Sequence, residues 1–323
     1  MWSHRFLLCV CTLLLACSPG QSSDVQELPS EEVLSLAAQA TKKMISAQYT
    51  AAGTFNADNA SGDAIDGKFR MDGVLQDSGE QMRFQMDLDA DFSDRSGSYN
   101  VDSTLEVVSI SEDEVYMNLH SITVNPNCDL FRPELIGKIA GQWWRLPADD
   151  SLPISGEVAP DPKLLHAQSQ IITVTKSLGI DTIGSSNAYH YEVELDKKKL
   201  LAYLAASGKD TASGDIQEIA EDMKNVVTNG EIWIDTETYF MHKISWSVSG
   251  LPISTGTASA EFVIDFRNHN AAPEIVPPTS AKIFSPLILL SNPQLDLEFE
   301  NSLQDMDDSD ELLDELIRTM NGN

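Results

Sequence analysis

Apolar and polar residues alternate strictly over two long stretches in the first third of the chain. Residues 64–76 and 81–92 each place apolar side chains or glycine on one face and mainly charged or amide side chains on the other. The segment Asp77-Ser78-Gly79-Glu80 joins them. A period of two over this length predicts a β-hairpin with one dry face and one wet face. The dry face carries Phe69, Met71, Met82, Phe84, Met86 and Leu88.

Shorter alternations extend this hairpin into a broad antiparallel sheet. The predicted neighbouring strands are residues 49–55, 97–108, 114–124, 142–146, 188–195, 230–235, 239–249 and 256–267. Apolar residues at helical spacing predict helices over residues 30–47, 131–141, 161–178, 196–204 and 213–227. Ser30 and Asp196 stand where residues that cap helices are favoured. The predicted fold class is therefore α+β, with long strands that imply a large curved sheet.

The N-terminus has the pattern of an export signal. Arg5 precedes an apolar run that ends in Leu14-Leu15-Ala16-Cys17, and a polar segment follows. The run is too short for a spanning helix, which needs about 20 residues. The Leu-Leu-Ala-Cys order resembles the lipobox of bacterial lipoproteins, in which the cysteine is acylated, for example with palmitate, and becomes the new N-terminus. An ordinary secretory signal is the alternative. The lipobox interpretation makes residues 1–16 a signal peptide and residues 17–29 a flexible tether.

The strongly negative charge of the chain disfavours some classes of binding partner. The formal net charge is −29, which argues against binding to nucleic acid and against adsorption to anionic lipid. Its simplest role is solubility. Once the signal peptide is removed and Cys17 is acylated, Cys128 is the remaining cysteine, so no intrachain disulfide is expected. Residues 279–323 form an acidic extension, with a marginal amphipathic helix predicted over 301–320.

The sequence lacks the common motifs of catalytic, metal-binding and cofactor-binding sites. The chain has no Gly-x-Ser-x-Gly, His-Glu-x-x-His, Cys-x-x-Cys or P-loop. His190 shares a strand face with Glu192 and Glu194, which we interpret as a solvated face. Four aspartates, Asp87, Asp89, Asp91 and Asp94, begin like a calcium loop but lack its glycine and glutamate. We therefore predict no enzymatic activity, no metal and no cofactor, with calcium at these aspartates as a minor alternative.

Three stretches resemble the LppX/LprG-type envelope lipoproteins, and more loosely the LolA/LolB-like carriers and the RseB N-terminal domain. They are residues 229–238 with the following Lys243-Ile244, residues 261–277, and Leu14 to Cys17. The resemblance covers residues 30–278 and excludes the acidic extension. It implies a half-barrel sheet wrapped around several helices, with an apolar cavity for acyl chains. It brings no catalytic residue.

The dry face of the hairpin is the candidate wall of that cavity. Methionine and phenylalanine side chains adapt to a flexible apolar ligand, so Phe69, Met71, Met82, Phe84, Met86 and Leu88 are the candidate binding residues. The alternative is a core face that the helices cover completely. The leading hypothesis is a lipid-binding protein of the cell envelope, extracytoplasmic and anchored to a membrane through Cys17. A ligand-free interaction or sensor module, whose acidic extension docks an envelope protein, is the second hypothesis.

Overall fold

One twelve-stranded sheet dominates the molecule. The computed structural model describes residues 28–59, 61–95, 97–111, 113–126, 133–147, 171–207, 219–253 and 256–285. The strands are β1 (Ser46–Asn59), β2 (Ala64–Gln76), β3 (Gln81–Asp94), β4 (Gly97–Ser111), β5 (Glu114–Asn125), β6 (Trp143–Arg145), β7 (Ile172–Ile183), β8 (Ser186–Leu195), β9 (Val227–Asp235), β10 (Met241–Ile253), β11 (Gly256–Arg267) and β12 (Lys282–Ile283). The helices are α1 (Ser30–Lys42), α2 (Pro133–Ile139) and α4 (Lys197–Ser207), with a 3-10 turn η1 (Asp77–Gly79) between β2 and β3.

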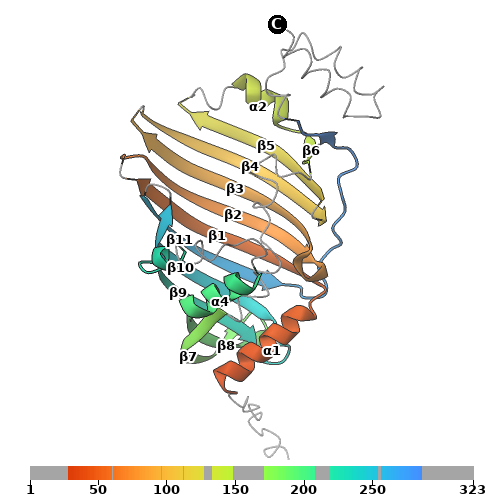
Figure 1. Cartoon of the computed structure of the whole chain (residues 1–323). Helices are drawn as coiled ribbons and strands as arrows, with labels where there is room; N and C mark the ends of the chain where they lie inside the picture. Colours follow the sequence, from red (N-terminus) through yellow and green to blue (C-terminus); the bar gives the residue numbers. More distant parts are fainter. Residues whose placement is uncertain are drawn as a thin grey trace, which may run out of the picture.

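The strands lie in the order β12-β6-β5-β4-β3-β2-β1-β11-β10-β9-β8-β7. Neighbours in this order pair antiparallel, except that β12 returns to pair with β6 in parallel. Because β1 pairs with β11, the early and late strands of the chain meet in the middle of the sheet. Figure 1 shows β1–β5 as a broad curved layer, with the blue segment after β11 running back towards β6. The predicted large, curved, antiparallel sheet is confirmed.

The hairpin predicted from the alternation is confirmed in its register. Strands β2 and β3 pair without a bulge from Ala64 opposite Ser93 to Gln76 opposite Gln81. An unbroken register keeps every second residue on the same face, so the dry face predicted from the sequence is continuous in the structure.

Helix α1 covers one end of the sheet. Its Val33 and Ala37 are buried in a core cluster with Tyr189, Tyr191 and Ile232 of β8 and β9. The cluster also contains Ile172, Val193 and Ile234. Of the described helices, α1 is the one that contributes residues to a core cluster. The wrapping of the sheet around several helices therefore stays a prediction.

Of the two predicted helix caps, Ser30 is wrong and Asp196 is confirmed. Ser30 does not cap α1: the Pro29 carbonyl accepts hydrogen bonds from the backbone N–H of Glu32 and Val33 and makes Pro29 the cap position. The predicted end of that helix was too late, because the helix ends at Lys42. Asp196 does cap α4, since its Oδ1 accepts from the backbone N–H of Lys198 at 3.0 Å and of Lys199 at 3.1 Å.

The helix predicted over residues 161–178 is wrong where the structure describes it. Residues 172–183 form strand β7, which pairs with β8. Two register shifts, between Val174 and Lys176 and between Ser177 and Gly179, break the alternation that would have marked a strand. The helix predicted to reach residue 227 is also too long, because Val227 begins β9. Residues 161–170 and 213–218 lie outside the described residues.

Several other predictions lie outside the described residues, among them Cys17, Cys128 and the helix over 301–320. Within the described ranges, no helix combines the length and apolar character needed to cross a membrane. The adjacent tryptophans of β6 point in opposite directions, as expected for a strand. Trp144 is buried and donates from Nε1 to the Ile139 carbonyl at 2.8 Å, whereas Trp143 is half-buried.

Candidate functional site

The six predicted wall residues lie together on one face of β2 and β3. Phe69 stands opposite Leu88, and Met71 stands opposite Met86. In the next two positions, Phe84 stands opposite Gly73 and Met82 opposite Leu75. The six side chains therefore occupy four consecutive cross-strand rows. Their role in binding is a prediction, but the sequence located their common face correctly.

These rows belong to a longer apolar face that crosses β1 to β4, which we call the apolar face. Its six rows start at Ala47 and end at Ala57 on β1, a length of about 33 Å along the strand. The rows are Ala47-Leu75-Met82-Ser109, Tyr49-Gly73-Phe84-Val107, Ala51-Met71-Met86-Leu105, Gly53-Phe69-Leu88-Ser103, Phe55-Gly67-Ala90-Val101 and Ala57-Ile65-Phe92-Tyr99. Two serines of β4, Ser103 and the buried Ser109, interrupt the run of apolar side chains and glycine.

Burial varies along the apolar face: it is high in the first two rows and again at Ala90 and Val101 in the fifth, and lower in the rows between and in the last. Met82 and Phe84, in the first two rows, are 2 % and 1 % exposed, and Leu75 is also buried. Met71 and Met86 in the third row are half-buried, as are Phe69 and Leu88 in the fourth. Among the described residues, the core cluster at the buried end consists of strand residues, with Tyr49, Leu75, Met82, Phe84 and Val107 at its centre. Apolar side chains in the middle of the face therefore keep surface that a ligand could cover.

Aromatic rings lie over glycines on this side of the sheet. A Cβ at Gly73 would fall 2.4 Å from Cζ of Tyr49, and one at Gly67 would fall 2.5 Å from Cζ of Phe55. Each ring therefore occupies the space that a side chain of the neighbouring strand would fill. The Tyr49 hydroxyl donates to Sδ of Met71 at 3.5 Å, and burial raises the pKa of this phenol above its ordinary value. These pairs depend on the register between strands, so they could not be predicted from the alternation along a single strand.

The opposite face of β2–β4 is polar, and its aspartates are engaged by neighbouring strands. Asp89 pairs with Lys68 at 3.0 Å and accepts from Nδ2 of Asn100 at 2.8 Å. Asp91 also accepts from Asn100, and Asp87 accepts from the Thr104 hydroxyl. These aspartates lie along β3 rather than in a loop, and among the described residues no group of three or more His, Cys, Asp or Glu is arranged to hold a metal.

His190 stands at the centre of a polar network on the same side of β7–β10. Its Nδ1 lies 2.8 Å from Oδ2 of Asp181, and its Nε2 lies 2.8 Å from Oε2 of Glu231. Trp233 stacks on the imidazole at 4.2 Å and donates from Nε1 to Asp181. Lys243 lies over the indole. The face predicted to be solvated therefore carries a network of ion pairs and a ring stack. Glu231 also lines a pocket of about 640 Å³ on this face.

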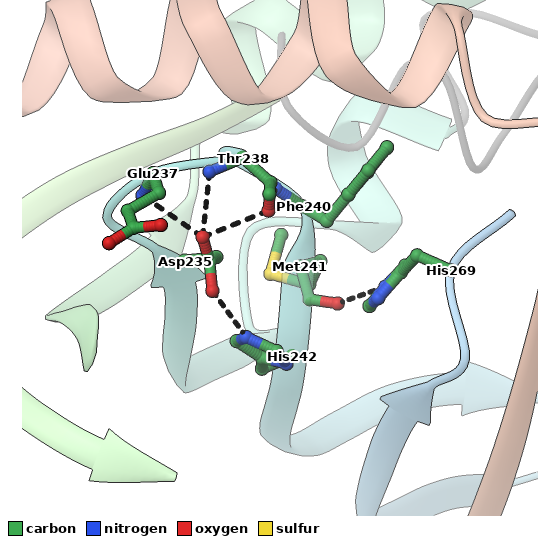
Figure 2. A network of polar contacts seen from close by, with 7 residues as sticks. All are labelled: Asp235, Glu237, Thr238, Phe240, Met241, His242 and His269. Atoms are coloured by element: carbon green, nitrogen blue, oxygen red, sulfur yellow. Dashed lines mark hydrogen bonds and ion pairs between the residues drawn. The ribbon is translucent and has the colours of Figure 1, made fainter. Parts of the chain in front are cut away.

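A second network fixes the turn between β9 and β10 (Figure 2). Oδ1 of Asp235 accepts from the backbone N–H of Glu237 at 2.9 Å, the backbone N–H of Thr238 at 2.7 Å and the Thr238 hydroxyl at 2.9 Å. Its Oδ2 accepts from Nε2 of His242 at 2.9 Å. Burial alone would raise the pKa of Asp235, but these hydrogen bonds outweigh it and hold the pKa at about 2.

His269 joins the segment after β11 to this turn. Its Nε2 lies 2.9 Å from the Met241 carbonyl, and its ring stacks on Phe240 at 4.8 Å. Burial lowers the pKa of His269, so the neutral imidazole is favoured there. Met241 packs against the core cluster that contains α1. The network therefore holds the segment after β11 against the start of β10. The contact could not be predicted from the sequence, because His269 is distant from Met241 along the chain.

No family model matches the chain, and no curated protein matches it either. Among solved structures it is similar to LprF from Mycobacterium bovis, with 14 % identity, a TM-score of 0.35 and coverage of 78 % of this chain and 97 % of that one. Lipoprotein LppX from Mycobacterium tuberculosis gives 11 % identity, a TM-score of 0.33 and coverage of 76 % and 97 %. A LolA superfamily protein from Nitrosomonas europaea gives 9 %, 0.21, and 75 % and 94 %.

The names of these solved structures are those of groups that the sequence resembles, the LppX-type and LolA-like proteins. What this chain binds has to be inferred from its own residues.

Proposed function

We propose that this protein is an exported lipoprotein, anchored through Cys17, that holds the acyl part of a lipid or another apolar molecule on the apolar face. It acts as a binding protein and not as an enzyme. The observation that supports this most is the middle of the apolar face, where the side chains are apolar but only half-buried. Met71 and Met86 stand there opposite each other.

The physical basis is the burial of apolar surface. Each Å² of apolar area that a ligand covers contributes about 25 cal/mol. An acyl chain lying across the rows from Phe69 to Met86 would cover several side chains at once. Thioethers are flexible and polarisable, so the same wall can fit chains of different length and saturation.

The test is a measurement of ligand affinity with matched variants on the two faces of the same strands. A fluorescent fatty acid is titrated into the full chain and into the variant Met71→Gln/Met86→Gln. The control is Asp72→Ala/Gln85→Ala, because these two residues are the next pair in the register and lie on the polar face. We expect the first variant to weaken binding at least about tenfold, or 1.4 kcal/mol. The control should bind as the unmodified protein does.

Thermal unfolding of both variants establishes that a loss of affinity is not a loss of fold. Equal weakening in the two variants, or no uptake of fatty acid by the unmodified protein, would contradict the proposal. The second outcome would favour the interaction or sensor module, whose acidic extension docks an envelope protein.

The anchor has its own test. Cells that express the protein are labelled with a fatty acid, and the protein is compared with Cys17→Ser. We expect label in the unmodified protein and none in the variant, which should also keep its signal peptide. Equal labelling of both would rule out acylation at Cys17.

A further inference from the structure

The apolar face opens into a pocket at its less buried end. The pocket has a volume of about 710 Å³, and its apolar floor is the last row of the face, Ala57, Ile65, Phe92 and Tyr99. The rings of Phe92 and Tyr99 are stacked, with centroids 5.1 Å apart and planes within 6°. A chain lying on the apolar face would therefore reach this pocket without leaving apolar surface.

The rim of the pocket is charged, in contrast to its floor. It is formed by Asp58, Asp63, Asp94 and Arg95, from the ends of β1 and β3 and the turns that follow them. Three carboxylates and one guanidinium give the rim an excess of negative charge, but they also place both signs of charge around one opening. A purely apolar ligand could form neither ion pairs nor hydrogen bonds with these rim side chains.

Hydrogen bonds join the described residues of the β1–β2 turn, Asn59, Ser61 and Asp63. Nδ2 of Asn59 donates to Oδ2 of Asp63 at 2.8 Å, and Oδ1 of Asn59 accepts from the backbone N–H of Ser61 and of Asp63. The hydrogen bond from Asn59 is the main reason that the pKa of Asp63 lies below its usual value, so this carboxylate is anionic at neutral pH. A fixed, charged acceptor of this kind can recognise a cation without further reorganisation.

Arg95 is the available cation of the rim. Its side chain is exposed, and among the described residues no hydrogen bond or ion pair engages it, although its charge acts on Asp63 and helps to lower the pKa of that carboxyl. By contrast, Lys68 and Arg83 on the polar face are paired with Asp89 and Glu106. A planar guanidinium that is not already paired suits a phosphate group.

We propose that this pocket seats the head group of a zwitterionic phospholipid whose acyl chain lies on the apolar face. The phosphate binds Arg95, and the ammonium group binds among the rim carboxylates, above the Phe92–Tyr99 pair. Carboxylates and aromatic faces both attract a cation, and the negative excess of the rim disfavours a head group with net negative charge. This inference rests on the proposed function, since it extends the same ligand beyond its chain.

The experiment compares ligands with the same single acyl chain and different head groups. Lysophosphatidylethanolamine, lysophosphatidylglycerol and a monoacylglycerol each compete against a fluorescent fatty acid bound to the full chain. We expect lysophosphatidylethanolamine to bind at least about tenfold more tightly than the other two. Arg95→Gln and Asp63→Asn should each remove most of this preference and leave the affinity for the monoacylglycerol unchanged. Lys68→Gln, which removes a cation outside the pocket, should keep the preference.

The outcomes separate this inference from the proposed function. If all three amphiphiles bind equally and Arg95→Gln changes nothing, the head-group site is wrong and chain binding stands. If lysophosphatidylglycerol binds best, the assignment of the ammonium group is wrong. If glycerophosphoethanolamine, which has no acyl chain, competes as well as the lipid, the pocket is a site for a soluble ligand. If no amphiphile binds, both proposals fail together.

Discussion

The two ends of the sheet bury their apolar surfaces by different means. On β7–β9, the side chains of β8 and β9 pack beneath Val33 and Ala37 of α1, and the cluster includes residues with almost no exposed surface. On β1–β5, the described core cluster contains strand residues alone, and Met71 and Met86 at its margin are half-buried. The covered end is built as a core, whereas the other end keeps apolar surface available. The half-buried methionines Met71 and Met86 lie at the end that keeps this surface.

The sharpest test of this contrast compares one truncation at each end. Ile234 is fully buried under the α1 cluster, so Ile234→Ala should lower the free energy of unfolding by about 2–5 kcal/mol. Met86 already contacts solvent, and Met86→Ala should cost about 1 kcal/mol or less. Unfolding in urea, with the slopes m compared, measures both. Equal losses would mean that the apolar face is an ordinary core.

The second test concerns the polar network of the covered end. Asp235→Asn should cost about 2 kcal/mol at pH 7, because the native carboxylate is held at a pKa of about 2, below its ordinary value of 3.8. A depressed pKa stabilises the fold above the unfolded-state pKa. The difference between the two proteins should therefore be constant above about pH 5 and disappear as the pH falls towards 2.

Glu237→Gln is the matched control for Asp235. Glu237 contacts Asp235 through its backbone N–H and its side chain is exposed, so this variant should match the unmodified protein at every pH. The stability of all three proteins is measured by urea unfolding between pH 2 and pH 8. A deficit of Asp235→Asn that persists at pH 2 would show that the loss comes from packing and not from the carboxylate.

The sequence predicts best those features whose signal is local. Strand β2 matches its predicted limits and β3 runs two residues past its prediction, because the alternation along each strand is unbroken and fixes the dry face. Strand β7 was missed because two bulges change the phase of its alternation, and apolar residues then recur at a spacing that resembles a helix. Local periodicity therefore fails where a strand is irregular, even when its pairing is extensive.

The candidate site divides in the same way. The six side chains of the dry face lie in two consecutive strands, so the sequence located them together. Asp63 and Arg95 line one pocket because the β1–β2 turn and the β3–β4 turn lie at the same end of these neighbouring strands. His269 reaches Met241 from the segment after β11. Such contacts depend on the order of the strands in the sheet, which cannot be predicted from the residues of a single segment.

The smallest effect tests the aromatic–glycine pairs that shape the apolar face. Gly73→Ala would place a Cβ 2.4 Å from Cζ of Tyr49, so the ring must move, and we expect a loss of about 1–2 kcal/mol. Gly137→Ala is the control, because a Cβ there meets no atom within 4 Å and alanine is the better helix former, by about 1 kcal/mol.

The variant Tyr49→Ala removes the ring that blocks this position, so a double-mutant cycle isolates the contact. In the Tyr49→Ala background, Gly73→Ala should no longer be destabilising, and the coupling between the two changes should be about 1 kcal/mol or more. Urea unfolding of the four proteins measures it. Additive losses would show that the glycine does not serve to accommodate the ring. Strong coupling would show instead that the Tyr49 ring and Gly73 form one packing unit, in which the missing side chain of one strand makes room for the ring of the next.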